Sequence, residues 1–166
     1  MRHRFFSLLL LGLGLGVVIP GMAQDRTDEL IVVTDLQALG KQANKHKRPI
    51  LMMFSQDNCP YCVLMEENYL RPLLRNREYD EKLLIRKFKI DSDKTLTDFD
   101  GSPIKAQALK DRYQSYVTPT LVFVNSNGEQ IATKLVGIGT EGFFAGDIDQ
   151  AIEVARRHLQ AVAFNQ

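Results

Sequence analysis

A single pair of cysteines, Cys59 and Cys62, is the feature that most constrains this chain, because its 166 residues contain no other cysteine. The pair forms a Cys-Pro-Tyr-Cys motif between the apolar run of residues 50–54 and a helix-like segment, residues 63–74. The first turn of a helix has free backbone N–H groups and a partial positive charge, which lower the pKa of a thiol placed there below about 8.5. Pro60 suits the first helical position, because it has no N–H group and its φ angle is preset. The motif predicts a redox-active pair, with Cys59 as the exposed nucleophile and Cys62 as the resolving thiol.

Three other interpretations of the cysteine pair stay open at this level. A structural zinc site needs four ligands, but the chain has no second cysteine pair, and His46 and His158 show no ligand spacing. A structural disulfide across so short a loop would stabilise the fold only weakly. Two buried, unreactive thiols are the third alternative. A Cys-x-x-Cys motif near a β–α pattern is nevertheless typical of redox proteins, and we expect neither a metal nor an organic cofactor.

The N-terminal segment, residues 1–23, has the form of a secretory signal peptide. A short basic stretch precedes the apolar run of residues 5–19, and small residues follow this run just before Gln24. The run is shorter than the roughly 20 residues of a membrane-spanning helix, which favours cleavage before Gln24 over an uncleaved N-terminal anchor. We therefore exclude residues 1–23 from the fold and assign residues 24–166 to one domain.

Composition narrows the functional class of this domain. Removal of residues 1–23, which contain two arginines, changes the formal net charge from +1 to −1. Such a balance does not indicate a nucleic-acid-binding protein or a protein of anionic membrane surfaces. The chain is long enough to bury a hydrophobic core. An exported protein with two cysteines in one motif is not a disulfide-rich scaffold.

The hydrophobic pattern predicts strands that alternate with helices. Apolar and β-branched runs predict strands at residues 28–33, 50–55, 83–90, 121–124 and 129–136. Periodic apolar residues predict helices at residues 34–48, 59–74, 102–113 and 147–162. Three strands separated by helices need crossover connections and hence parallel neighbours, whereas the last two strands should form an antiparallel hairpin. The expected fold class is α/β, a mixed central sheet flanked by helices on both faces.

Several local expectations accompany this pattern. Thr34 opens a capping-box sequence, and Ser102-Pro103 resembles a helix cap followed by a first helical proline. Arg71-Pro72 should kink or break the helix that follows Cys59. The acidic segment of residues 91–101 is expected to be a solvated loop, because its aspartates lack the spacing of an EF-hand calcium loop. Two phenylalanines in the predicted loop of residues 139–146 are expected to be exposed.

In combination these motifs resemble the thioredoxin superfamily. The resemblance rests on the Cys-Pro-Tyr-Cys motif after an apolar strand, on the Thr-Pro-Thr-Leu-Val-Phe sequence of residues 118–123, and on the Gly-bounded segment 128–137. It covers residues 35–159. Together with the signal peptide, it is similar to exported bacterial thioredoxin-like proteins of the SoxW type. The resemblance implies a thioredoxin-like fold, a periplasmic location and thiol–disulfide oxidoreductase activity.

The resemblance also assigns roles to individual residues. Cys59 would attack a substrate disulfide, and Cys62 would resolve the mixed disulfide to give a redox-active Cys59–Cys62 disulfide. Pro119 would match the family's cis-proline, which faces the cysteine pair, although an ordinary strand-entry proline is the alternative. Thr118 would then hold a substrate strand by backbone hydrogen bonds. Tyr61 stands between the cysteines, so we expect its edge to lie near the substrate.

The chain departs from the family at two positions. Thioredoxins carry a tryptophan before the first cysteine and a buried aspartate six residues before it, and here these places hold Asn58 and Met53. The family's buried carboxylate assists proton removal from the resolving thiol. Its absence is expected to change the kinetics of exchange relative to those of cytosolic thioredoxins.

The resemblance favours a monomeric reductant that exchanges disulfides with protein substrates. In an exported setting it would need a membrane-bound electron donor or acceptor. A disulfide oxidant or isomerase stays open, as does a non-catalytic redox-sensing module that binds peptides. The direction of exchange is set by reduction potentials, which these residues do not reveal.

Overall fold

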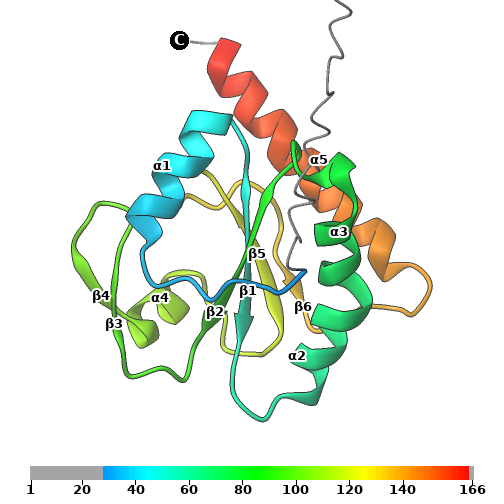
Figure 1. Cartoon of the computed structure of the whole chain (residues 1–166), viewed down its shortest axis with the longest axis horizontal. Coiled ribbons are helices and arrows are strands. Elements are labelled where there is room, and N and C mark those ends of the chain that lie inside the picture. Colours follow the sequence, from blue (N-terminus) through cyan, green and yellow to red (C-terminus); the bar gives the residue numbers. More distant parts are fainter. Residues whose placement is uncertain (1–27, 165–166) are drawn as a thin grey trace, which may run out of the picture.

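The computed structural model describes residues 28–164 of the chain. The signal peptide predicted for residues 1–23 and the cleavage site before Gln24 lie outside the described residues. Figure 1 shows a central sheet with helices on both of its faces. The sheet contains parallel and antiparallel pairs. The expected fold class, an α/β fold with a mixed sheet, is confirmed.

Within residues 28–164 the main sheet has the strand order β2-β1-β5-β6, and a separate hairpin pairs β3 with β4. The strands are β1 (Ile50–Ser55), β2 (Leu84–Lys89), β3 (Thr95–Thr97), β4 (Pro103–Lys105), β5 (Thr120–Val124) and β6 (Leu135–Val136). The α-helices are α1 (Leu36–His46), α2 (Pro60–Met65), α3 (Arg71–Arg75), α4 (Ala106–Arg112) and α5 (Phe144–Phe164). A π-helical turn, Glu66–Leu70, joins α2 to α3, and a short 3-10 helix, Arg77–Tyr79, follows α3.

Strand β1 lies at the centre of the sheet, and every one of its residues is buried. It pairs in parallel with β2, where Ile50 lies opposite Leu84. It pairs antiparallel with β5, where Phe54 lies opposite Thr120. Helices cover both faces of the sheet, so the strand has no need of polar residues on alternate positions. This agrees with its prediction as a strand buried on both faces.

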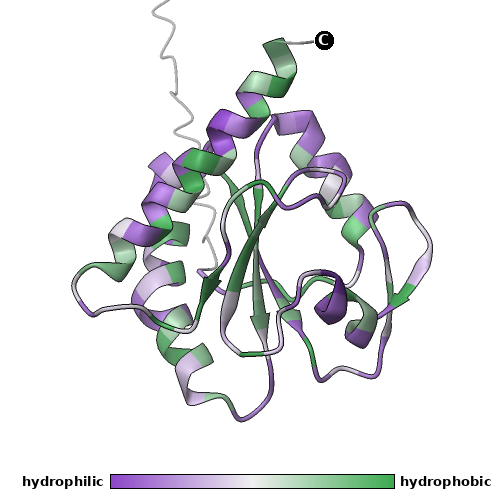
Figure 2. Cartoon of the chain, turned by 180° about the vertical axis from the view of Figure 1, so that it is seen from behind, coloured by the Kyte–Doolittle hydropathy of each residue, from purple (hydrophilic) through white to green (hydrophobic). Residues whose placement is uncertain are grey.

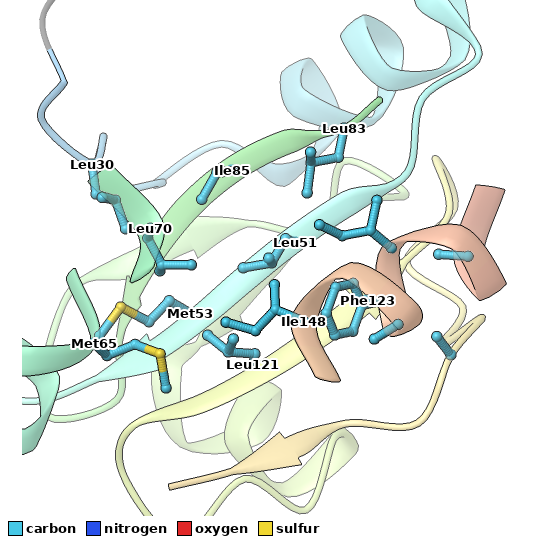
Figure 3. Close-up of a cluster of buried hydrophobic side chains, with 14 of the residues drawn as sticks. Leu30, Leu51, Met53, Met65, Leu70, Leu83, Ile85, Leu121, Phe123 and Ile148 are labelled. Atoms are coloured by element: carbon cyan, nitrogen blue, oxygen red, sulfur yellow. The ribbon is translucent and has the colours of Figure 1, made fainter. Parts of the chain in front are cut away.

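Alternate residues of β1 point into two hydrophobic cores. The core beneath α2, α3 and α5 also contains Cys62, and we call it the Cys62 core (Figure 3). Its buried residues include Leu30, Leu51, Met53, Cys62, Met65, Leu70, Ile85, Leu121, Phe123 and Ile148. Ile50, Met52 and Phe54 point the other way, into the core beneath α1 and α4. The strands are accordingly hydrophobic and the outer helix surfaces largely hydrophilic (Figure 2). Each fully buried apolar side chain stabilises the fold by about 1.5–3 kcal/mol relative to exposure.

The predicted first strand, residues 28–33, forms one bridge rather than a full strand. Val32 pairs in parallel with Lys87 of β2. The N–H of Val33 donates to the Lys87 carbonyl at 2.8 Å, and the N–H of Lys87 donates to the Ile31 carbonyl at 2.9 Å. The predicted parallel direction is correct, but the segment is shorter because α1 begins three residues after Val33. It covers the outer edge of β2.

The cap of α1 differs by one residue from the prediction. Asp35, not Thr34, is the N-cap, and its carboxylate accepts a hydrogen bond from the N–H of Ala38 at 2.8 Å. A carboxylate at this position also interacts favourably with the helix dipole. Thr34 instead uses its carbonyl to accept from the N–H of Thr97 in β3 at 3.0 Å. The apolar residues whose spacing predicts this helix lie on its buried face, since Leu36, Leu39 and Ala43 are all buried.

Of the kink or break predicted at Arg71-Pro72, the break does not occur, because the helix continues through these residues by means of the π turn. The N–H of Arg71 donates to the carbonyl of Glu66, five residues earlier. The wider turn makes room for the ring of Pro72, and the missing N–H of Pro72 falls in the first turn of α3. The α2–α3 segment therefore stays continuous over the Cys62 core.

The predicted helix start at Ser102-Pro103 is also wrong. Pro103 is the first residue of β4 and pairs with Thr97 of β3, and α4 begins only at Ala106. Proline is tolerated at the first residue of an edge strand, where no ladder hydrogen bond needs its N–H. The hydroxyl of Ser102 donates to the carboxylate of Asp100 at 2.7 Å instead of capping a helix. The acidic segment of residues 91–101 thus contains half of a small hairpin.

The direction of β5 relative to β1 and β2 is one that the sequence pattern did not predict. Helix α4 has seven residues, a length of about 10 Å. Such a helix is too short to carry the chain back to the opposite end of the strands, where a strand parallel to β1 would have to begin. The chain therefore re-enters the sheet at the end where β2 left it, and β5 runs antiparallel to β1. The antiparallel pairing of β5 with β6 agrees with the predicted hairpin.

The C-terminal part confirms some expectations and corrects others. Gly128 closes the hairpin turn with a φ of +82°, as predicted. The returning strand of residues 129–136 is reduced to β6 and one bridge between Val124 and Gln130. Phe143 is exposed as expected, but Phe144 is buried and packs edge-to-face on Tyr69 with ring centroids 5.0 Å apart. Phe144 is the first residue of α5, which begins three residues earlier than predicted.

An ion pair fastens the β3–β4 hairpin to α4. Arg112 donates to the carboxylate of Asp98 through both terminal nitrogens, with Nη1 and Oδ1 2.8 Å apart. Asp98 is buried, whereas the Arg112 side chain is 40% exposed. The hydrogen bond from Arg112 holds the pKa of Asp98 below its ordinary value. The pair should therefore contribute to stability wherever Asp98 is ionised.

We predict that Asp98→Asn lowers the free energy of unfolding by about 1–2 kcal/mol at pH 7, after allowance for the exposure of Arg112. Because folding lowers the pKa of Asp98, this stabilisation is present above the unfolded carboxyl pKa of about 3.9 and is lost as the pH falls below it. Urea unfolding at a series of pH values measures the difference. Asp111→Asn is the matched control, because Asp111 is an exposed aspartate on α4, next to Arg112. An equal loss in both variants, or a loss independent of pH, contradicts the assignment.

Candidate active site

The cysteine pair lies at the start of α2, directly beyond the buried end of β1. Cys59 is the N-cap of α2, and its Sγ accepts a hydrogen bond from the N–H of Cys62 at 3.1 Å. Pro60 occupies the first helical turn, as predicted. Hydrogen bonding from a backbone N–H favours the charged form of the sulfur that accepts it. The local structure is thus suited to a Cys59 thiolate in the reduced protein.

The loop before Cys59 is held in place from β2. The N–H of Asp57 donates to the carboxylate of Asp91 at 2.7 Å. The carboxylate of Asp57 pairs with Lys89, the last residue of β2. Asn58 then adopts a positive φ of 53°, which asparagine tolerates better than most residues. These contacts fix where the chain turns from β1 into the cysteine motif.

The two sulfurs differ in their access to solvent. Cys59 and Cys62 form a disulfide whose Cα atoms lie 5.2 Å apart. Cys59 is half-buried, whereas Cys62 is only 2% exposed and belongs to the Cys62 core. An incoming disulfide can therefore reach Cys59 but not Cys62. This asymmetry supports the assignment of Cys59 as the nucleophile and Cys62 as the resolving thiol.

The antiparallel direction of β5 brings the predicted proline loop to the cysteines. The Thr118–Pro119 peptide bond is cis, as the resemblance implied. The Oγ1 atom of Thr118 lies 3.6 Å from the Sγ of Cys59. Pro119 is buried, and its carbonyl accepts a hydrogen bond from the N–H of Gly137 at 2.8 Å. Within residues 28–164 the backbone N–H and carbonyl of Thr118 make no hydrogen bond, which leaves them available to an extended substrate.

Exposed apolar side chains lie in the segments that carry the cysteines and the cis-proline loop, and on the strand next to β5. Tyr61, Tyr116, Val117 and Val136 are each more than half exposed, and we call them the apolar collar. Tyr61 lies inside the cysteine motif, and the next two precede Thr118. Val136 lies opposite Thr120, at the start of β5. Grouped exposed apolar residues are typical of surfaces that bind other proteins. The exposure of Tyr61 leaves its side chain accessible, and its place near the substrate stays a prediction.

The position of the family's buried aspartate is apolar here. Met53 is fully buried in the Cys62 core. A charged pair that the sequence analysis did not single out lies nearby. The Nζ of Lys87 is 2.9 Å from each carboxylate oxygen of Glu66. Two signals could have found it: Glu66 follows Cys62 by one helical turn, and Lys87 interrupts an apolar strand.

Within residues 28–164, no group of three or more His, Cys, Asp or Glu side chains is arranged to hold a metal ion. Asp98, one of the acidic residues of the segment 91–101, instead pairs with Arg112.

A family model for a thioredoxin-like domain matches residues 36–151. The chain belongs to the thioredoxin-like family. This fold, together with the Cys59–Cys62 pair, suggests thiol–disulfide redox activity. The matched family model describes thioredoxin-like domains in general, so the finer likeness to exported proteins of the SoxW type stays a prediction.

Solved structures agree with this family. The chain is similar to thioredoxin from Fasciola hepatica, with a TM-score of 0.51 and 18% identity, over 78% of this chain and 99% of that chain. It is also similar to an uncharacterized thioredoxin-like protein from Clostridium perfringens, with a TM-score of 0.50 and 22% identity, over 81% and 90% of the two chains. Mitochondrial thioredoxin 3 from Saccharomyces cerevisiae has a TM-score of 0.51 and 15% identity, over 75% and 93%. At these identities the likeness shows the fold alone. A comparison with curated protein sequences gave no match.

We predict that iodoacetamide alkylates Cys59 of the reduced protein at least about tenfold faster than Cys62 at neutral pH. Cys59 is half-buried at the helix end, where its thiolate is stabilised, whereas Cys62 is covered by the apolar core. Peptide mass spectrometry at successive times measures the two rates. The single variants Cys59→Ala and Cys62→Ala provide each rate separately. Equal rates, or faster reaction at Cys62, would reverse the assigned roles.

Proposed function

We propose that this thioredoxin-like protein is an exported, periplasmic thiol–disulfide oxidoreductase that reduces disulfides in protein substrates. The observation that carries the proposal is the asymmetric cysteine pair. Cys59 is accessible and lies 3.6 Å from Thr118 Oγ1, while Cys62 is buried directly behind it. An inert structural disulfide needs no accessible sulfur, and its short loop would contribute little stability.

The reaction consists of two exchanges. The Cys59 thiolate attacks one sulfur of a substrate disulfide, which breaks that bond and releases the other substrate sulfur as a thiolate. Cys62 then loses its proton and attacks the Sγ of Cys59. The mixed disulfide breaks, the second substrate thiolate leaves, and the Cys59–Cys62 disulfide forms. Two electrons pass from the enzyme dithiol to the substrate, and the same steps run backwards would oxidise a dithiol.

The surface around Cys59 supports a protein substrate. The apolar collar can bind the apolar side chains of a polypeptide, and the free backbone groups of Thr118 can pair with its main chain. Main-chain pairing accepts many sequences, because it reads no side chain. Tyr61, Thr118 and Pro119 are therefore the proposed substrate-binding residues. A substrate strand held there would present its disulfide to Cys59.

The reduced enzyme must be regenerated after each turnover. In the periplasm we expect the electrons to come from a membrane-bound donor, because that compartment is kept oxidising. Among residues 28–164, no helix combines the length and the apolar character of a membrane span. We propose that the domain acts as a monomer, with the accessible cysteine serving both the donor and the substrate in turn.

We predict that the reduced domain catalyses the reduction of insulin disulfides by dithiothreitol, followed as turbidity. Cys59→Ala should abolish the catalysed rate, because it removes the attacking sulfur. Cys62→Ala should accumulate mixed disulfides with its substrates, since the resolving sulfur is missing. Asp111→Asn on α4 serves as a folded control. A wild-type rate no higher than the dithiothreitol background would support a non-catalytic peptide-binding or redox-sensing module instead.

We predict that the exported protein begins at Gln24. The segment before it has the length and composition of a cleaved signal peptide rather than of an anchor. Intact-mass measurement of protein isolated from the cell envelope of a bacterial host tests this directly. A full-length mass in the membrane fraction would support the anchored alternative, and a cytosolic protein would contradict export.

A further inference from the structure

The proposed function leaves one proton without a described destination. Cys62 must become a thiolate before it can resolve the mixed disulfide, because the thiolate is the nucleophile. Its sulfur is buried in the Cys62 core, where desolvation disfavours the charged form. The side chain is 2% exposed, so bulk water has little access to the thiol. A proton acceptor has to reach this thiol from within the protein.

The other buried residues of the Cys62 core offer no proton acceptor. Met53, Met65 and Leu121 belong to the same core and carry no titratable group. On β2, the residues that face this core change in character along the strand. Ile85 is buried in the Cys62 core, whereas Lys87, two residues further on, forms an ion pair. Lys87 lies opposite Met53 in the register of β1 and β2. Charge therefore begins at the margin of the core that holds Cys62.

Glu66 brings a carboxylate to that margin. It follows Cys62 by four residues, and the N–H of Glu66 donates to the Cys62 carbonyl. Side chains four residues apart on a helix are neighbours, with about 5–6 Å between Cβ atoms. Both carboxylate oxygens lie 2.9 Å from the Nζ of Lys87. The side chains of Glu66 and Lys87 are only 13% and 20% exposed, so the pair is largely shielded from solvent.

We propose that Glu66 accepts the proton of Cys62 when Cys62 resolves the mixed disulfide, with Lys87 holding the carboxylate in position. This proposal rests on the proposed oxidoreductase function. The helix thereby supplies the carboxylate, because Met53 occupies the strand position where the family carries its buried aspartate. The gap between neighbouring helical side chains is one that a single water can bridge.

The step balances as follows. The proton leaves the Sγ of Cys62 and passes through one water to the carboxylate of Glu66. The sulfur electron pair forms the bond to Cys59, and the substrate sulfur departs with the electrons of the broken bond. Glu66 then releases the proton to solvent through its exposed edge. At neutral pH a carboxylate is a far stronger base than water, so it lowers the cost of the transfer.

Other charged groups near Glu66 lie on β2, in the loops that follow β1 and β2, and on the helix itself. On β2, the positive charge of Lys89 interacts with the carboxylate of Glu66. The pKa of Lys89 is raised chiefly by its hydrogen bond to Asp57. Asp57 and Asp91 lie in the loops that follow β1 and β2. On the helix itself, Glu67 faces solvent and pairs with Arg71 at 3.1 Å. Lys87 is the cation in direct contact with the Glu66 carboxylate.

A purely structural role accounts poorly for this pair. A buried or half-buried ion pair often stabilises a fold no more than apolar residues of the same size would. The adjoining positions of the core are apolar and would accept such residues. The π turn that begins at Glu66 is also a feature that occurs frequently at functional sites. A pair retained at the margin of the resolving thiol is consistent with a chemical use.

The test separates the two exchanges in one experiment. Reduced protein is mixed with DTNB in a stopped-flow instrument: the first thionitrobenzoate released reports attack by Cys59, and the second reports resolution by Cys62. We expect Glu66→Gln to leave the first phase within about twofold and to slow the second at least about tenfold at pH 7. The second phase should then rise with pH as hydroxide replaces the lost acceptor. Glu66→Asp, which keeps a carboxylate, should recover part of the rate.

Glu67→Gln is the matched control, because Glu67 is an adjacent, exposed residue on the same helix. Circular dichroism and thermal unfolding establish that each variant folds, and Glu66→Asp provides a second comparison if Glu66→Gln does not. If the second phase and its pH profile are the same in Glu66→Gln and Glu67→Gln, the inference is overturned. If the wild-type protein shows no first phase, the proposed function itself fails, whatever the second phase shows.

Discussion

The double pairing of β1 controls the position of each reacting group. β1 is bonded to β2 along one edge and to β5 along the other, and helices cover both of its faces. A strand held in this way cannot shift its register without moving apolar side chains out of both cores. Its last residues lead into Cys59. Because β5 runs antiparallel and begins opposite Phe54, the same pairing also brings Thr118 to that sulfur.

The elements that could be predicted from the sequence are those with a strong local pattern. The unbroken apolar run of β1 indicates a strand buried on both faces, and only the centre of a sheet offers that environment. The apolar periodicity of α1 likewise indicates which of its faces is buried. The turn at Gly128 follows from a residue that adopts a positive φ without strain. Each of these patterns is complete within a few neighbouring residues.

The wrong predictions concern residues whose preferences depend on tertiary contacts. Pro103 is compatible with a helix start and with an edge strand, and its pairing with Thr97 decides for the strand. Pro72 is compatible with a helix break and with a first helical turn, and the preceding π turn decides for the second. The direction of β5, for which the sequence pattern made no prediction, depends on how far α4 extends across the sheet. In each case the structure is decided by contacts that the local sequence pattern does not contain.

The site shows the same division between local and distant information. The motif of Cys59 and Cys62 is local, so the sequence predicts both residues and the order in which they react. The pair formed by Glu66 and Lys87 joins a helix to a strand twenty-one residues away, and the local signal at either residue does not show that the two meet.

The position of the Glu66–Lys87 ion pair helps to explain how one motif can hold two cysteines of unequal reactivity. Cys59 derives its acidity from the helix end and from access to solvent, neither of which reaches Cys62. Met53 and the rest of the core keep Cys62 protonated until it is needed. A thiol protected in this way becomes useful only if a base stands at the edge of the core. The margin where β2 changes from Ile85 to Lys87 is where the fold can supply one without opening the core to water.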